Sequence, residues 1–128
     1  MKLDGSRPIW VQLVDDFRRR IVSGRWPPGA KIPSVRELAT DAGVNPNTVQ
    51  RALSELDRAG LTVTERTAGR FVTTDVTVVA AVRHRLATAT TDTYIETVAA
   101  MGMDLGETTE LLQQRWSIHG GPTPGDAS

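Results

Sequence analysis

The chain has 128 residues and contains no cysteine, only two histidines and few aromatic residues. Without thiols it can form neither disulfides nor thiolate metal sites. His84 and His119 lie far apart in the sequence, with no cluster of carboxylates beside them, so we expect no metal site. Neither a plausible nucleophile–base set nor a phosphate-binding loop is present, so we predict no catalytic residue, no enzyme and no cofactor.

Long hydrophobic runs are also missing. No stretch of about 18 consecutive apolar residues exists, although a transmembrane helix would need one, and the first five residues lack the apolar core of a signal peptide. We therefore expect no contact with a membrane and a cytoplasmic location, which the lack of cysteine also suits.

The chain has no net charge, because 15 basic residues balance 15 acidic ones. The charges are unevenly distributed, however. Residues 1–75 contain twelve Lys/Arg and nine Asp/Glu, a balance of +3, and residues 76–128 contain three and six, a balance of −3. Any polyanionic partner is therefore expected to bind the first part of the chain.

Apolar residues recur every four positions from Ile9 to Ile21, which predicts an amphipathic helix over about residues 8–23. Ser34 and Glu37 have the spacing of a capping box, which predicts the start of a second helix. Gly43 is suited to end that helix.

A third helix is predicted after a tight turn, because Asn45 suits its N-cap and Pro46 its first position. Its apolar residues share one face. The opposite face carries Asn47, Gln50, Arg51 and Ser54. Two short helices joined in this way are typical of a helix-turn-helix, whose second helix enters the DNA major groove. The sequence therefore predicts a protein that binds a specific DNA sequence.

Two short strands are predicted next, over residues 61–65 and 70–74, with the turn at residues 67–69. This hairpin would be the wing of a winged helix. From residue 76, apolar residues at helical spacing predict a long helix to about residue 101, and a capping box at Asp104 and Glu107 predicts a last one.

The long helix and the short helix after the wing cannot bury the apolar residues of both helices against each other alone. We therefore predict an interchain helical bundle and hence a homodimer. Packing of the long helix on the chain's own wing domain is the alternative. The predicted dimer contacts are Val79, Val82, Leu86, Ile95, Val98, Leu111 and Leu112.

The predicted fold class is mostly α with a small β-hairpin wing: a winged helix-turn-helix followed by a two-helix dimerisation segment. The predicted domains are a DNA-binding domain at 7–75, a helical dimerisation segment at 76–117 and a disordered tail at 118–128, where glycine and proline are frequent.

Several motifs together resemble the winged-helix domain of GntR-type bacterial transcription regulators. They are the run from Pro33 to Ala39, the run from Gly43 to Ala52, Gly60-Leu61 and the stretch from Gly69 to Val72. The segment Asn-Pro-Asn-Thr-Val and the short C-terminal part resemble the YtrA subfamily in particular. The resemblance implies a DNA-binding homodimer, usually a repressor, that acts on its own operon or on a neighbouring one such as a transporter operon. It also implies dimerisation through two helices after the wing.

The resemblance further implies DNA contacts from Arg36, from the start of the third helix and from the wing at Gly69. This sequence departs from the usual wing motif Arg-Gly-x-Gly-Thr-Phe-Val, because Thr67 replaces its first glycine and Arg70 its threonine. Arg70 could itself enter a minor groove. Many family members also have arginine where Pro46 and Gln50 stand, so their base preference does not transfer.

Amides pair with adenine and guanidinium groups with guanine, so Gln50 and Arg51 are the predicted base contacts. Ser34 and Thr48 suit phosphates, because free backbone N–H groups point outward at a helix start. The predicted DNA-contacting residues are Ser34, Arg36, Asn45, Asn47, Thr48, Gln50, Arg51, Thr67, Gly69 and Arg70.

The predicted partner is double-stranded DNA with a pseudo-palindromic operator, since a two-fold dimer presents two recognition helices about 34 Å apart. The alternative function is a winged helix that binds a protein and no specific DNA, which the zero net charge favours. A small-molecule effector bound between the C-terminal helices of the dimer is a further hypothesis.

Overall fold

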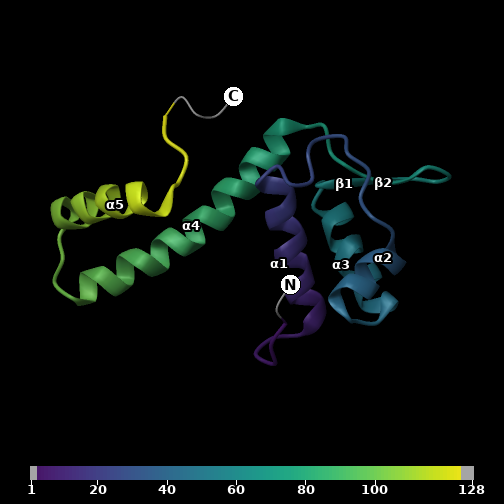
Figure 1. Cartoon of the computed structure of the whole chain (residues 1–128), viewed down its shortest axis with the longest axis horizontal. Helices are drawn as coiled ribbons and strands as arrows, with labels where there is room; N and C mark the ends of the chain where they lie inside the picture. Colours follow the sequence, from purple (N-terminus) through teal and green to yellow (C-terminus); the bar gives the residue numbers. More distant parts are fainter. Residues whose placement is uncertain (1–2, 125–128) are drawn as a thin grey trace. The chain divides into compact units, whose positions relative to one another are not determined.

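The structure is a computed structural model that describes residues 3–124 (Figure 1). Its elements follow the order α1 (Ile9–Val22), α2 (Val35–Ala42), α3 (Pro46–Arg58), β1 (Thr62–Glu65), β2 (Gly69–Val72), α4 (Val76–Ala100) and α5 (Leu105–His119). The chain divides into two compact units between Arg85 and Leu86, inside α4. No helix in the described part combines the length and the hydrophobicity needed to cross a bilayer.

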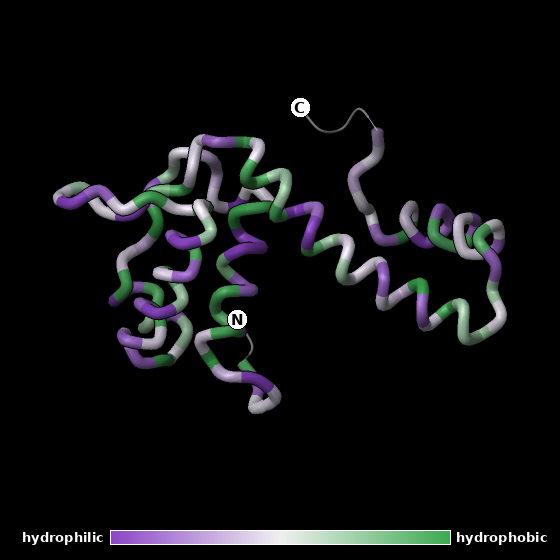
Figure 2. Tube along the Cα trace, turned by 180° about the vertical axis from the view of Figure 1, so that it is seen from behind, coloured by the Kyte–Doolittle hydropathy of each residue, from purple (hydrophilic) through white to green (hydrophobic). Residues whose placement is uncertain are grey.

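The core of the first unit forms around α3, which packs against both α1 and α2. Of the apolar residues that recur every four positions in α1, Leu13, Phe17 and Ile21 are buried and Ile9 is half-buried. Figure 2 shows hydrophobic residues of the chain in green. The largest fully buried side chains are Phe17, Leu13, Ile21, Leu53, Leu56, Leu61 and Val49. The predicted fold, a winged helix-turn-helix with a following helical segment, is confirmed.

Side-chain caps begin α2 and α3. The Ser34 hydroxyl accepts a hydrogen bond from the backbone N–H of Glu37 at 3.1 Å, and the Asn45 side chain accepts one from the N–H of Asn47 at 2.8 Å. Gly43 ends α2 with φ +68°, in the left-handed region where a side chain is disfavoured. Gly43 and the cap at Asn45 thus mark the two ends of the turn between α2 and α3.

The hairpin is anchored to the rest of the unit at its base. β1 and β2 pair antiparallel from Thr62 opposite Val72 to Glu65 opposite Gly69. The connection between α1 and α2 lies along the other edge of β2, because the N–H of Ile32 donates to the carbonyl of Arg70 and the N–H of Val72 to that of Ala30, both at 2.9 Å. Both strands are shorter than predicted, and Gly69 begins β2 instead of forming the turn.

The second unit contains the end of α4 and all of α5. Asp104 caps α5, as predicted, by accepting from the N–H of Glu107 at 2.9 Å. No residue of α5 is buried. Seven large apolar side chains of this unit are exposed: Ile95, Met101, Leu105, Leu111, Leu112, Trp116 and Ile118.

The start of the predicted tail is structured. α5 continues to His119, two residues beyond the expected boundary, and the Trp116 indole N–H donates to the carbonyl of Pro122 at 2.7 Å. Gly121 lies so close to the indole that an added Cβ would be 2.5 Å from a ring atom. Residues 125–128 of the predicted tail lie outside the described part.

Candidate nucleic-acid interface

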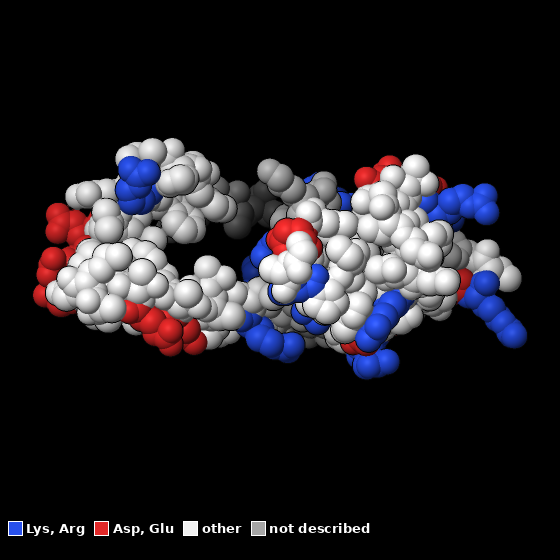
Figure 3. Space-filling view, turned by 90° about the horizontal axis from the view of Figure 1, so that it is seen from below, with Lys and Arg blue, Asp and Glu red and all other residues white. Residues whose placement is uncertain are grey.

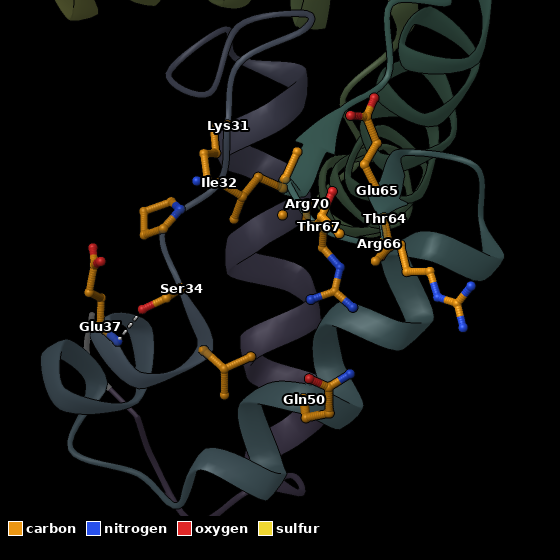
Figure 4. A pocket seen from close by; sticks show the side chains of 14 residues that line it. Lys31, Ile32, Ser34, Glu37, Gln50, Thr64, Glu65, Arg66, Thr67 and Arg70 are labelled. Atoms are coloured by element: carbon orange, nitrogen blue, oxygen red, sulfur yellow. Dashed lines mark hydrogen bonds between the residues drawn. The ribbon is translucent and has the colours of Figure 1, made fainter.

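A groove on the first unit is lined by the start of α2, by α3 and by the hairpin (Figure 4). The lining comprises residues 31–35, Glu37, Gln50 and residues 64–70. Among the residues predicted to contact DNA, five line this groove together: Ser34, Gln50, Thr67, Gly69 and Arg70. Three separate segments of the sequence therefore supply one surface.

The outer face of α3 carries three of the other predicted contacts, and two lie beside it. Asn47 and Arg51 are exposed and Thr48 is half-buried, while Arg36 is exposed on α2. Asn45 is also exposed, but its side-chain oxygen is engaged as the cap of α3. The exposed groups next to the turn are therefore amides and guanidinium groups, which suit both base edges and phosphates.

Arg51 does not line the groove. Its guanidinium carbon lies 4.0 Å from the centre of the Trp10 ring of α1. Gln50, one residue earlier, faces the hairpin. The two predicted base contacts therefore lie on opposite flanks of the exposed face of α3.

The tip of the wing carries an arginine that was absent from the predicted contacts. The turn comprises residues 66–68, and both Arg66 and Thr67 are exposed and line the groove. Arg66 occupies the arginine position of the usual wing motif, so the signal was present in the sequence. Lys31 adds another exposed cation to this groove.

Arg70, one of the predicted DNA contacts, pairs with Asp57 within the chain. Its side chain is 14% exposed and donates to the carboxylate of Asp57 at the end of α3, from Nε at 3.1 Å and from a terminal nitrogen at 3.0 Å. The hydroxyls of Thr62 and Thr64 on β1 donate to the same carboxylate. Because Asp57 holds both strands, this cluster fixes the wing to α3.

The pKa of Asp57 reflects these contacts. Burial of the carboxyl acts to raise its pKa, but the hydrogen bonds from Arg70 and Thr62, the guanidinium charge and the hydrogen bond from Thr64 outweigh burial. The pKa of Asp57 therefore lies below its ordinary value, and the carboxylate is charged at neutral pH.

The two units differ in the sign of the charges that they carry. On the face shown in Figure 3, Lys and Arg side chains project from the winged-helix unit, while Asp and Glu gather on the unit that contains α5. From residue 86 onward Arg115 is the only Lys or Arg, against six Asp or Glu. The first unit is thus the better electrostatic match for a polyanion.

The residues predicted to form the dimer differ in exposure and fall into three groups. Val79, Val82 and Val98 are 6, 6 and 8% exposed in the single chain, so they are already covered without a partner. Leu86 is half-buried. Ile95, Leu111 and Leu112 are 51, 37 and 47% exposed and thus accessible to a second copy.

Comparison with known proteins identifies the chain's relatives. Residues 11–72 match the family of bacterial regulatory proteins called gntR. The HTH-type transcriptional regulator YhcF of Bacillus subtilis (strain 168) is 33% identical over 112 residues, which are 88% of this chain and 93% of that protein. The HTH-type transcriptional repressor YtrA of the same organism is 43% identical over 67 residues, 52% of each chain.

Solved structures agree. A GntR family transcriptional regulator from Listeria monocytogenes superposes with a TM-score of 0.81 at 32% identity and covers 88% of this chain and 98% of its own. The DNA-binding domain of AraR in complex with its operator ORR3 superposes with a TM-score of 0.51 at 28% identity, over 56% of this chain and 87% of that one.

The fold and these relatives define a winged helix-turn-helix transcriptional regulator, a class of DNA-binding proteins. Within that class, the chain belongs to the GntR family of bacterial regulatory proteins.

Proposed function

We propose that this protein is a dimeric transcriptional repressor that binds a pseudo-palindromic operator of its own or a neighbouring operon and so blocks the polymerase. The observation that carries the proposal is the groove in which the start of α2, Gln50 of α3 and the wing meet. Residues 7–75 bind DNA and residues 76–117 dimerise in this proposal, which places the protein in the cytoplasm with the genome.

The elements around this groove of the protein contact different parts of the DNA in the proposal. α3 enters the major groove and presents Asn47, Gln50 and Arg51 to base edges. The uncapped backbone N–H groups at the start of α2 and the nearby Arg36 contact phosphates. Arg66 at the wing tip reaches the neighbouring minor groove. Arg70 is assigned the internal role of holding the wing.

The proposed dimer rests on the second unit. Seven large apolar side chains of α4, α5 and their connection are exposed there, including Ile95 and Leu112, and no residue of α5 is buried. Exposed apolar surface concentrated in this way is typical of a protein–protein contact. The resemblance to the YtrA subfamily, with the repressor YtrA among the relatives, supports both the dimer and the sign of regulation.

Fluorescence anisotropy tests the proposal. A labelled duplex from the promoter upstream of the gene is compared with a scrambled duplex at 50 and 200 mM salt. We expect preferential binding to the promoter that weakens with salt and with Gln50→Ala. Arg58→Ala, at the far end of α3, is the matched control and leaves base preference unchanged. Equal binding to both duplexes would refute recognition of this promoter. If the protein bound neither duplex but still bound a protein partner, the result would favour a protein-binding module.

A further inference from the structure

Trp10 and Arg51 form a contact between α1 and the recognition helix α3. The guanidinium carbon of Arg51 lies 4.0 Å from the centre of the tryptophan ring. Trp10 is half-buried, whereas Arg51 is exposed. Among aromatic side chains tryptophan attracts a cation most strongly, and a planar guanidinium stacks on such a ring.

This contact leaves the hydrogen-bonding edge of Arg51 free. The N–H donors of a guanidinium lie in its plane, so a ring against its face does not consume them. Within residues 3–124 the structure gives the Arg51 side chain no hydrogen bond and no ion pair beside this ring contact. Arg70 differs, because its donors are engaged by Asp57. Arg51 therefore keeps the two parallel donors that guanine O6 and N7 require.

The position of Arg51 on α3 explains why α1 supplies the support. Successive helical residues are separated by about 100°. Gln50 faces the hairpin and lines the groove there, so Arg51 points to the other flank, where Trp10 lies. Asn47 precedes Arg51 by one turn and is exposed on the same side of the helix. The exposed face of α3 is thus bordered by the wing on one flank and by Trp10 on the other.

We propose that Trp10 is a positioning residue for base recognition: it holds the Arg51 guanidinium in the orientation that selects guanine at one position of each operator half-site. A long side chain held in place before binding loses less conformational entropy when it contacts DNA. The inference rests on the proposed function. It assigns a role in specificity to a residue that lies just before the residues 11–72 matched to the family.

Selection from a random duplex pool tests the proposal on the full chain. Wild type, Trp10→Leu, Trp10→Phe, Arg51→Ala and the double variant Trp10→Leu/Arg51→Ala are each used to enrich bound duplexes, and base frequencies are compared at every position. Arg58→Ala, which removes an exposed arginine at the other end of α3, is the charge-matched control. Thermal melting verifies that every variant is folded. Anisotropy then measures affinity for the enriched duplex and for the duplex with its guanine replaced.

We expect Arg51→Ala to abolish the preference for guanine at one position per half-site. Trp10→Leu should lower the preference at that same position by about 2- to 5-fold, the effect of losing one exposed cation–π contact, and Trp10→Phe should retain most of it. In the Arg51→Ala background, Trp10→Leu should leave the base preference at that position unchanged.

Three results would overturn the inference while leaving the proposed function standing. In the first, Trp10→Leu weakens binding to both duplexes equally. In the second, Trp10→Leu lowers the preference for guanine as much in the Arg51→Ala background as in wild type. In the third, Arg51→Ala keeps the base preference of wild type. If wild type itself enriches no sequence, the proposed function fails and the inference fails with it.

Discussion

Asp57 and Arg70 allow the attachment of the wing to be tested through an asymmetry in stability. The Arg70 side chain is 14% exposed and that of Asp57 is 31% exposed. Asp57→Asn therefore leaves a mostly buried guanidinium without its counter-charge, at a cost of about 1–3 kcal/mol. Arg70→Met leaves a more exposed carboxylate that still accepts from Thr62 and Thr64, at a cost of about 0.5–1 kcal/mol.

Urea denaturation followed by circular dichroism at pH 7 measures both costs. We expect Asp57→Asn to lower the free energy of unfolding more than Arg70→Met does, and the double variant to lose less than the sum of the two. Neighbours that share one interaction are non-additive in this way. Equal costs that add in the double variant would show that the pair is not the anchor of the wing.

Acid adds an independent check. The pKa of Asp57 is lowered in the folded chain from an ordinary value of 3.8. The resulting stability is therefore fully present above that ordinary value and is lost as the pH falls through the lower folded pKa. The difference in the free energy of unfolding between wild type and Asp57→Asn should shrink below about pH 4. A difference that stays constant down to pH 2 would contradict this assignment.

The two arginines of the wing, Arg66 and Arg70, are expected to affect DNA binding in different ways. Arg66→Ala should reduce the slope of log affinity against log salt by about 1, the change expected when one cationic contact to DNA is lost, because Arg66 is proposed to contact the DNA. Arg70→Met should weaken binding through a looser wing and leave that slope nearly unchanged. If Arg70→Met reduced the slope as much as Arg66→Ala does, Arg70 would contact DNA after all.

Three further predictions concern stability and assembly. Ser34→Ala removes the cap of α2 and should cost about 0.5–2 kcal/mol in urea denaturation, with the exposed Thr40→Ala as control. Leu53→Ala at a fully buried position should cost about 2–5 kcal/mol, and a loss below 1 kcal/mol would contradict the described core. Leu112→Glu places a charge on the proposed dimer surface, so sedimentation equilibrium should show a shift toward the monomer, whereas an unchanged mass would exclude Leu112 from the interface.

The local elements could be predicted from the sequence because their signals are local. The four-residue spacing from Ile9 to Ile21 produced α1, and the caps at Ser34, Asn45 and Asp104 began α2, α3 and α5 as expected. Each of these signals involves residues within about one helical turn, so no knowledge of the tertiary structure was needed.

The tertiary partners could not be predicted in the same way. Nothing in the spacing indicates that Arg70 meets Asp57 or that Arg51 meets Trp10, because both contacts depend on how separate elements pack. Periodicity likewise shows that Val79 and Val82 share an apolar face but not what covers it, and both are already buried in the single chain. The candidate site was therefore predicted as a set of residues, and the structure adds the internal role of Arg70 and the exposed Arg66.

Hydroxyl-radical footprinting of an operator duplex tests whether a two-fold dimer binds DNA through α3, because it maps both recognition helices at once. A dimer that inserts two copies of α3 should protect two segments centred about 10 base pairs, or a whole multiple of one turn, apart and related by a dyad. Gln50→Ala should weaken both equally. A single protected segment without a dyad, or no protection at concentrations where the duplex is bound, would contradict the claim that a two-fold dimer recognises DNA through α3.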